Sequence, residues 1–279
     1  TLQLQKQKSI LQKGLYLFLY NSCFYFILIS IRTIISVNYT VEEFGYFTFS
    51  FTIANAVMLL LDSFNTILFP KTIDLMSSDD NKKKADALEK MRVGYILTSH
   101  MLVYLAMICF PILVWFIPKY MPALSSMNMI ALAVLMNTNS YGYSNMLIAQ
   151  NKEHKAGFIS AVSLIVNIIL GLGLAKILNV EYSYITIAIL VAYMISSFLM
   201  AYEGDTILRR EKSVSYTLKH FFPIRMFIPY MIALIISCTQ IEYLIFIPLL
   251  VFIMLNYKDL QFLKNIALKL IKEPEVIDV

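Results

Sequence analysis

Long apolar stretches dominate the chain, and most of them are long enough to cross a lipid bilayer as a helix. A helix rises 1.5 Å per residue, so about 20 apolar residues span the hydrocarbon core. The last two of the eight candidate spans are short and contain Pro229 and Pro248, which favours kinked or tilted helices. The candidate spans are Gly14–Val37, Phe44–Phe69, Val93–Ile117, Met127–Ala149, Ala156–Leu178, Tyr182–Ala201, Pro223–Ser237 and Tyr243–Tyr257.

The composition supports the same class of protein. Hydrophobic residues make up 59% of the 279 residues and charged residues only 15%, against roughly 45–50% and 25% in soluble domains. This balance excludes a disordered chain, a secreted disulfide scaffold and an ordinary cytosolic enzyme. We therefore expect an all-α, polytopic membrane helix bundle with about eight transmembrane helices.

The Lys and Arg residues gather in alternate segments between the spans. The chain has 23 Lys and Arg residues. Twenty of them lie before the first span or in the segments that follow the second, fourth, sixth and eighth spans, including the edges of those segments. The other segments hold only Lys119 and Lys176, while Arg32 lies inside a span. Because short cytoplasmic loops carry the excess of basic residues, both termini are predicted to be cytoplasmic. This pattern accounts for the net charge of +5, and we expect no nucleic acid as a partner.

These spans and loops divide the chain into five expected parts. In the longest basic loop, Lys71–Arg92, we expect Pro70 to end the second span and Asp80–Met91 to form a separate polar helix in the cytoplasm. The expected parts are a cytoplasmic segment (1–13), a six-helix membrane lobe (14–202), a cytoplasmic loop (203–222), two additional membrane helices (223–257) and a cytoplasmic tail (258–279).

Two charged residues fall inside spans, where a charge costs at least about 2.5–3.5 kcal/mol. Arg32 lies five residues from the outer end of the first span. It could extend its charge to the outer headgroups, or face an internal cavity and bind an anionic substrate, since a guanidinium matches phosphate oxygens bidentately. Asp62 lies about 27 Å from the outer face, so the two charges are not expected to pair. Asp62 is either a protonatable coupling site or a neutral acid that hydrogen-bonds Asn65 or another helix.

The second half of the fourth span is unusually polar. It runs from Asn137 to Asn145 as Asn-Thr-Asn-Ser-Tyr-Gly-Tyr-Ser-Asn. By their spacing, Asn137, Tyr141 and Ser144 are predicted to lie on one face of this helix. That face is either the wall of a hydrophilic cavity, suited to sugar hydroxyls and ring faces, or a set of hydrogen bonds between helices.

Motifs of soluble enzymes are absent from the sequence. It contains no Walker loop, GxSxG, HExxH or GxGxxG pattern. Its three cysteines, Cys23, Cys109 and Cys238, have no metal-site spacing. We therefore expect no catalytic residues, metal or cofactor, and a protein that is not an enzyme.

Several short motifs resemble those of one family of transporters. Residues 10–200 are similar to the second half of bacterial polysaccharide-repeat flippases, in the multidrug/oligosaccharidyl-lipid/polysaccharide exporter superfamily. The motifs are Arg32-Thr-Ile-Ile-Ser36, Glu43-Phe-Gly-Tyr46, Phe69-Pro-Lys71, Ile117-Pro-Lys-Tyr120 and Ala149-Gln-Asn-Lys152.

The resemblance implies a fold and a function. In this family two six-helix lobes enclose a cationic cavity and flip undecaprenyl-diphosphate-linked oligosaccharides across the bacterial plasma membrane, for O-antigen or capsule assembly. The chain would then be the second lobe plus two extra helices, and a portion of a longer transporter. Arg32 matches the family's basic residue late in the first helix of that lobe, although Ile31 stands where many members carry an acid. Expected partners are the lipid-linked oligosaccharide, membrane lipids and the polysaccharide polymerase machinery.

Three alternatives remain at this point. A cation-coupled multidrug or small-molecule exporter of the same superfamily would depend more on Asp62 than on Arg32. A membrane-embedded polysaccharide polymerase would need large outward loops with catalytic groups, and the outward loops here are short. A membrane scaffold that transports nothing would give no functional role to Arg32 and Asp62, the charged residues inside the spans.

Overall fold

The computed structural model describes residues 2–77, 81–209 and 213–272. Within this part every element is a helix, so the expected all-α architecture is confirmed. The α-helices are α1 (Leu2–Asn38), α2 (Val41–Ser77), α3 (Asn81–Phe116), α4 (Leu124–Thr138), α5 (Tyr143–Ala149), α6 (Glu153–Lys176), α7 (Thr186–Arg209), α8 (Val214–Phe221), α9 (Ile224–Thr239) and α10 (Ile247–Lys272). Short 3₁₀ turns lie at η1 (Pro118–Ala123), η2 (Tyr182–Ile185) and η3 (Glu242–Leu244).

The helices are those of a multi-pass membrane protein. Among the described residues, seven helical segments are long and apolar enough to cross a bilayer, and α8 with α9 makes an eighth if that bent pair is one span. The helix axis bends by 67° between α8 and α9. Large apolar side chains such as Phe18, Leu59 and Ile169 are exposed on the outside of the bundle, which is the surface that lipid covers.

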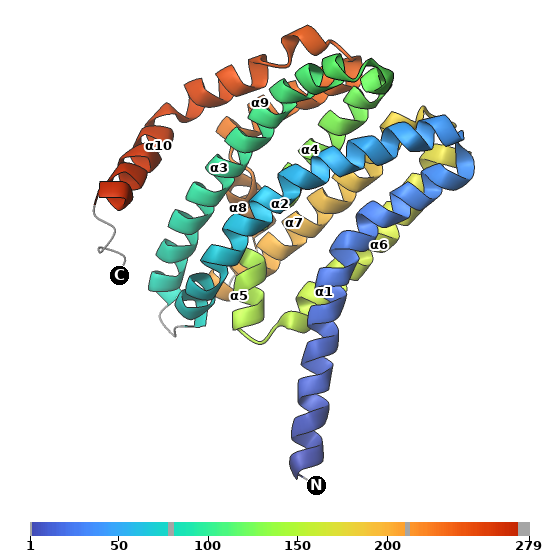
Figure 1. The fold of residues 1–279 in the computed structure, drawn as a ribbon. Coiled ribbons are helices and arrows are strands. Elements are labelled where there is room, and N and C mark those ends of the chain that lie inside the picture. The colour runs from blue at the N-terminus through green and yellow to red at the C-terminus, as the bar shows by residue number, and fades with distance from the viewer. Residues whose placement is uncertain (1, 78–80, 210–212, 273–279) are drawn as a thin grey trace.

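The centre of the bundle is α4. Every residue of α4 except Asn137 is buried, and the helix packs against α2, α3, α7 and α9. Around it, α1 packs along α6 and α10 packs along α9 (Figure 1). The α9–α10 pair contacts α3 and α4, so it belongs to the same body as the first six spans.

Several helices extend further than the sequence suggested. The prediction that Pro70 ends the second span is wrong, since α2 continues to Ser77; a membrane helix tolerates proline where neighbouring groups satisfy the freed backbone. The predicted separate helix Asp80–Met91 is also wrong. From Asn81 this segment is the first part of α3, continuous with the span, while Asp80 lies outside the described residues. The described residues at either end also extend the helices beyond the predicted spans, in α1 from Leu2 to Gly14 and in α10 from Tyr257 to Lys272.

The two ends of the bundle differ. At one end, here called the short-loop end, α1 joins α2, α6 joins α7, and η1 follows α3 (Figure 1). Tyrosine hydroxyls connect the loops at this end: Tyr39 donates to the Val180 carbonyl at 2.6 Å, and Tyr182 donates to the Pro122 carbonyl at 2.6 Å. These hydrogen bonds tie separate helix pairs together at the short-loop end.

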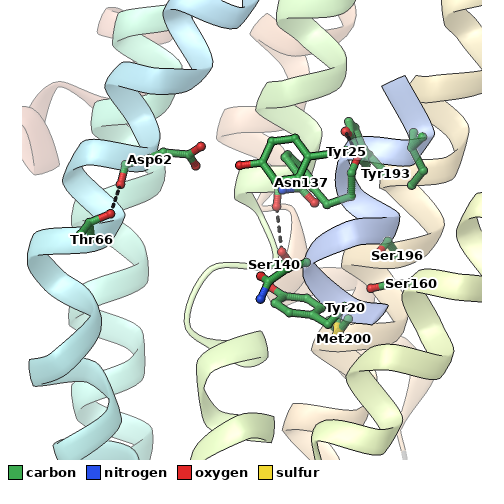
Figure 2. A pocket seen from close by; sticks show the side chains of 13 residues that line it. Tyr20, Tyr25, Asp62, Thr66, Asn137, Ser140, Ser160, Tyr193, Ser196 and Met200 are labelled. Atoms are coloured by element: carbon green, nitrogen blue, oxygen red, sulfur yellow. Dashed lines mark hydrogen bonds between the residues drawn. The ribbon is translucent and has the colours of Figure 1, made fainter. Parts of the chain in front are cut away.

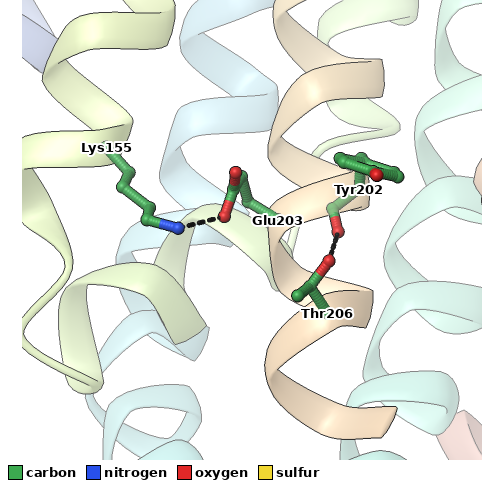
Figure 3. A network of polar contacts seen from close by, with 4 residues as sticks. All are labelled: Lys155, Tyr202, Glu203 and Thr206. Carbon is green, nitrogen blue, oxygen red and sulfur yellow. Dashed lines mark hydrogen bonds and ion pairs between the residues drawn. The ribbon is translucent and has the colours of Figure 1, made fainter. Parts of the chain in front are cut away.

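The opposite end, here called the basic end, carries α5, α8 and the start of α1 (Figure 1). Lys13, Lys152 and Lys219 lie there. Toward this end α1 and α2 diverge (Figure 1). The ion pair of Lys155 with Glu203 holds α6 to α7 at the same end (Figure 3). The bundle is therefore wider at the basic end than at the short-loop end.

Candidate functional site

A polar cavity lies inside the bundle, between the diverging halves of α1 and α2. Its volume is about 350 Å³. Figure 2 shows Asp62 on α2 pointing across the cavity toward Asn137 on α4, with serines and tyrosines of other helices around it. The polar lining residues are Tyr20, Asn21 and Tyr25 from α1, Asp62 and Thr66 from α2, Asn137 from α4, Ser140, Ser160 from α6, and Tyr193 and Ser196 from α7.

A smaller compartment of about 70 Å³ adjoins this cavity. The two share Tyr20, Phe24, Asp62, Asn137 and Ser140 as lining residues. The other polar groups of the smaller compartment are Tyr95, Thr138, Tyr141, Ser144 and Asn145. Four of the five residues singled out from the sequence, Asp62, Asn137, Tyr141 and Ser144, therefore border one connected hollow.

These residues meet because the fourth span is broken. The prediction of one continuous helix over Met127–Ala149 is wrong: α4 ends at Thr138, and α5 begins at Tyr143 after a turn. Gly142 in that turn has φ 82°, a backbone conformation that side chains with a Cβ disfavour. Consequently Asn137, Tyr141 and Ser144 do not share a helical face. They lie in the last turn of α4, in the break and in the first turn of α5.

The break is stable inside the bundle because its backbone groups find partners. The Ser140 hydroxyl donates to the Asn137 carbonyl at 2.8 Å. From α7, the Ser197 hydroxyl donates to the Met136 carbonyl at 3.1 Å. The Arg92 guanidinium donates to the Asn139 carbonyl at 2.6 Å and to the Tyr141 carbonyl at 2.8 Å. An irregular backbone at membrane depth is tolerated only with such partners.

Asp62 is the acidic group of the cavity. It is half-buried, and within the described residues the ion pairs are Lys155 with Glu203 and Arg225 with Asp259, so no described cation pairs with it. The side chain of Asn65, an alternative partner expected from the sequence, lies outside the part of the chain that the structure describes. Asp62 thus faces a hollow lined by hydroxyl and amide groups. Such groups can hydrogen-bond the carboxylate in either its charged or its protonated form.

Arg32 lies apart from this site. It borders neither compartment, and its guanidinium carbon sits 5.4 Å from the ring centre of Phe44, at the short-loop end of α1 and α2. Ile27 is the lining residue of α1 closest to it in sequence, so Arg32 is about 8 Å further along the helix axis. The structure therefore does not bring Arg32 together with Asn137, Tyr141 and Ser144.

Sequence reasoning missed part of the cavity wall. Tyr20, Tyr25, Tyr193, Ser160 and Ser196 line it, but isolated Tyr and Ser residues in apolar spans give no signal, because they also occur as packing and hydrogen-bonding residues. The sequence analysis also treated Arg92 as an ordinary loop cation, although it is buried. Its position at the edge of a span was the available hint.

The chemistry of the cavity follows from these groups. The lining residues include hydroxyls, amides, aromatic rings and one carboxylate, and none of those that the structure describes is Lys or Arg. Nowhere in the described ranges do three His, Cys, Asp or Glu side chains come together. Such a wall can hydrogen-bond a polyhydroxylated group, contact the face of a ring and hold a proton or cation at Asp62.

Comparisons with known proteins add no relative. No family model matches the chain, and neither the curated proteins nor the solved structures contain a match. The fold and the cavity therefore define the class, a multi-pass helical membrane protein with a polar internal cavity.

Proposed function

We propose that the chain forms the substrate-carrying bundle of a transporter that moves a sugar-bearing lipid across the bacterial plasma membrane. The observation that carries this proposal is the polar hollow around Asp62, between helices apolar enough to cross a membrane. Polar and ionisable groups are costly in a membrane interior and mark substrate or ion pathways there. Combined with the resemblance of the sequence motifs to polysaccharide-repeat flippases, the hollow favours transport over a scaffold role.

The glycan part of the substrate is the part that suits the cavity. Tyr25 supplies an exposed aromatic ring, and Asn137, Ser160 and Ser196 supply hydrogen-bonding groups. A diphosphate does not suit it, because Asp62 would repel an anion and no described lining residue is a cation. In this proposal the diphosphate contacts groups outside the cavity, and Arg32, further along α1, is one of them.

Asp62 serves as the coupling residue in this proposal. A carboxylate in a hollow without a described cationic partner can take up a proton or a cation when the cavity faces one side and release it on the other. The basic end faces the cytoplasm, as the distribution of Lys and Arg favours. The loops tied together at the short-loop end and the wider basic end then suit a cavity that opens to the cytoplasm.

A second function is favoured by a specific feature of the same wall. Tyr20, Tyr25 and Tyr95 line the two compartments that Asp62 borders, and aromatic rings with an acid also suit an organic cation. A cation-coupled exporter of cationic small molecules is therefore the alternative.

Replacement of Asp62 separates these possibilities. We expect Asp62→Asn to reduce surface polysaccharide at least about tenfold in the bacterium that carries the gene, when the full-length variant replaces the native protein. Asp62→Glu keeps the carboxylate and should retain part of the activity. Asp259→Asn is the matched control, because Asp259 pairs with Arg225 away from the cavity and should leave surface polysaccharide normal.

The outcome is read by quantifying surface polysaccharide and the efflux of a cationic dye at equal protein levels. Normal polysaccharide with Asp62→Asn would contradict the flippase proposal. If dye efflux were lost at the same time, the organic-cation exporter would be the correct function.

A further inference from the structure

The buried Arg92 is the strongest feature that the proposed function leaves unexplained. Its side chain is 6% exposed, and it borders neither compartment of the cavity. It extends from the start of the membrane-spanning part of α3 into the space where α4, α5, α7 and α8 meet. A fully buried guanidinium needs extensive hydrogen bonding to compensate for the loss of water.

The partners of Arg92 are backbone groups of the break in the fourth span. One nitrogen, Nη1, donates both to the Asn139 carbonyl at 2.6 Å and to the Tyr141 carbonyl at 2.8 Å. The guanidinium carbon lies 4.1 Å from the ring centre of Tyr143, the first residue of α5. Arg92 therefore contacts residues before and after Gly142, and it bridges the two sides of the break.

The space around the break leaves little freedom. A Cβ on Gly142 would lie 2.5 Å from Leu88 Cδ1 and 3.3 Å from Arg92 Cγ. On α7, a Cβ on Gly204 would lie 2.5 Å from Tyr143 Cδ1. The break is thus packed closely between α3 and α7.

A second charge stands near the guanidinium. Asp205 on α7 is buried and interacts electrostatically with Arg92. It accepts a hydrogen bond from the Thr217 hydroxyl of α8 at 2.8 Å. Arg92 also approaches the Phe221 carbonyl at the end of α8, at 3.5 Å. These contacts connect the break to the bent α8–α9 pair.

We propose that Arg92 is the positioning residue of the substrate cavity: by bridging the break between α4 and α5 it fixes where Tyr141 and Ser144 face the hollow. The role rests on the proposed function in that the wall it shapes is the wall that contacts substrate. Arg92 itself touches no substrate. Lysine is a poor substitute, because its side chain is shorter, so its ammonium group does not reach the two carbonyls in the same geometry, and it has no planar group to stack on Tyr143.

Thiol reactivity along the cavity wall tests this role. Single reporters Ser140→Cys, Ser144→Cys and Ser160→Cys are placed in a full chain whose Cys23, Cys109 and Cys238 are replaced by alanine, and the rate of reaction with N-ethylmaleimide is measured in nanodiscs. Ser140 and Ser144 lie at the break, whereas Ser160 lines the same cavity from α6. The comparison therefore separates a local change from general loosening.

With Arg92→Lys we expect the rates at the first two reporters to rise at least about tenfold, and the rate at Ser160→Cys to change less than twofold. Arg225→Lys is the matched control, since Arg225 pairs with Asp259 between α9 and α10, and it should leave all three rates unchanged. Unchanged rates at the break with Arg92→Lys, or an equal rise at Ser160→Cys, would overturn the proposal.

A measurement on the unaltered chain covers the case in which Arg92→Lys does not fold. Hydrogen exchange of the peptide covering residues 139–145 should be slowed nearly as much as that of α4. Exchange as fast as in an unstructured loop would show that the break is not held, and the proposal would fall. Neither measurement uses a substrate, so failure here leaves the Asp62 test of the proposed function standing, and the reverse also holds.

Discussion

One backbone angle at Gly142 decides the shape of the cavity wall. The positive φ of 82° at Gly142 interrupts the helix between α4 and α5, and no space remains for a Cβ beside Leu88 and Arg92. A non-glycine residue in such a region costs about 1–3 kcal/mol. Glycine is therefore required here for both conformational and steric reasons.

We expect Gly142→Ala to destabilise the protein and to lower its midpoint of thermal unfolding by several degrees. Gly173 in α6 is the matched control, because a Cβ there meets no atom within 4 Å and its φ is helical. Gly173→Ala should leave the midpoint unchanged or raise it slightly, as alanine favours helix. Differential scanning fluorimetry in nanodiscs measures both. Equal effects of the two substitutions would contradict this account of the turn.

At the residue scale, the sequence singled out four residues that border the cavity, but it left open whether they line it or hydrogen-bond between helices. Asp62, Asn137, Tyr141 and Ser144 border the cavity because polar groups cannot face lipid. The same rule applies to Arg32, but a long side chain can meet it without a cavity, and here the guanidinium lies over Phe44. Arg92 was missed because its partners are backbone carbonyls, which no sequence pattern reveals.

At the scale of helices, the packing of α1 on α6 illustrates how small residues and amides hold the bundle together. Asn167 on α6 donates to the Ile27 carbonyl at 2.9 Å and to the Ser30 hydroxyl at 2.8 Å. Gly157 and Gly171 lie on the same face of α6 and allow close approach.

These two glycines should respond differently to the same substitution. A Cβ on Gly157 would lie 2.9 Å from the backbone carbonyl oxygen of Tyr16, so Gly157→Ala must separate the two helices. A Cβ on Gly171 would meet the Cδ1 atoms of Ile31 and Ile34, which can rotate away. We expect Gly157→Ala to cost about 1–3 kcal/mol and Gly171→Ala clearly less. Thermal unfolding of both variants checks the order, and a larger loss with Gly171→Ala would refute the packing described here.

Most of the helices could be predicted from the sequence, but their interruptions could not. Apolar length alone locates the first six spans, since the bilayer sets that length. The break after Thr138 lies within a stretch that is long enough to be one span, and it depends on contacts with Arg92 and Ser197 from distant helices. At Pro70 the error was the reverse: the sequence predicted the end of a helix, but α2 continues through this residue to Ser77.

For the whole molecule, the proposed function requires that the cavity holds water and opens at the basic end, which the distribution of Lys and Arg predicts to face the cytoplasm. Ser196 and Met194 on α7 provide a direct comparison. Ser196 is 8% exposed and lines the cavity, whereas Met194 is 41% exposed on the outside of the bundle. Steric access alone favours reaction at position 194, while access to water favours reaction at position 196.

The decisive measurement is the reaction of Ser196→Cys and Met194→Cys, each without the native cysteines, with a charged methanethiosulfonate in inside-out membrane vesicles. Such reagents attack the thiolate, which forms in water and not in lipid. We predict that Ser196→Cys reacts at least about tenfold faster than Met194→Cys, and faster in inside-out than in right-side-out vesicles. A dry cavity would give the reverse order between the two positions, and that result would contradict the account.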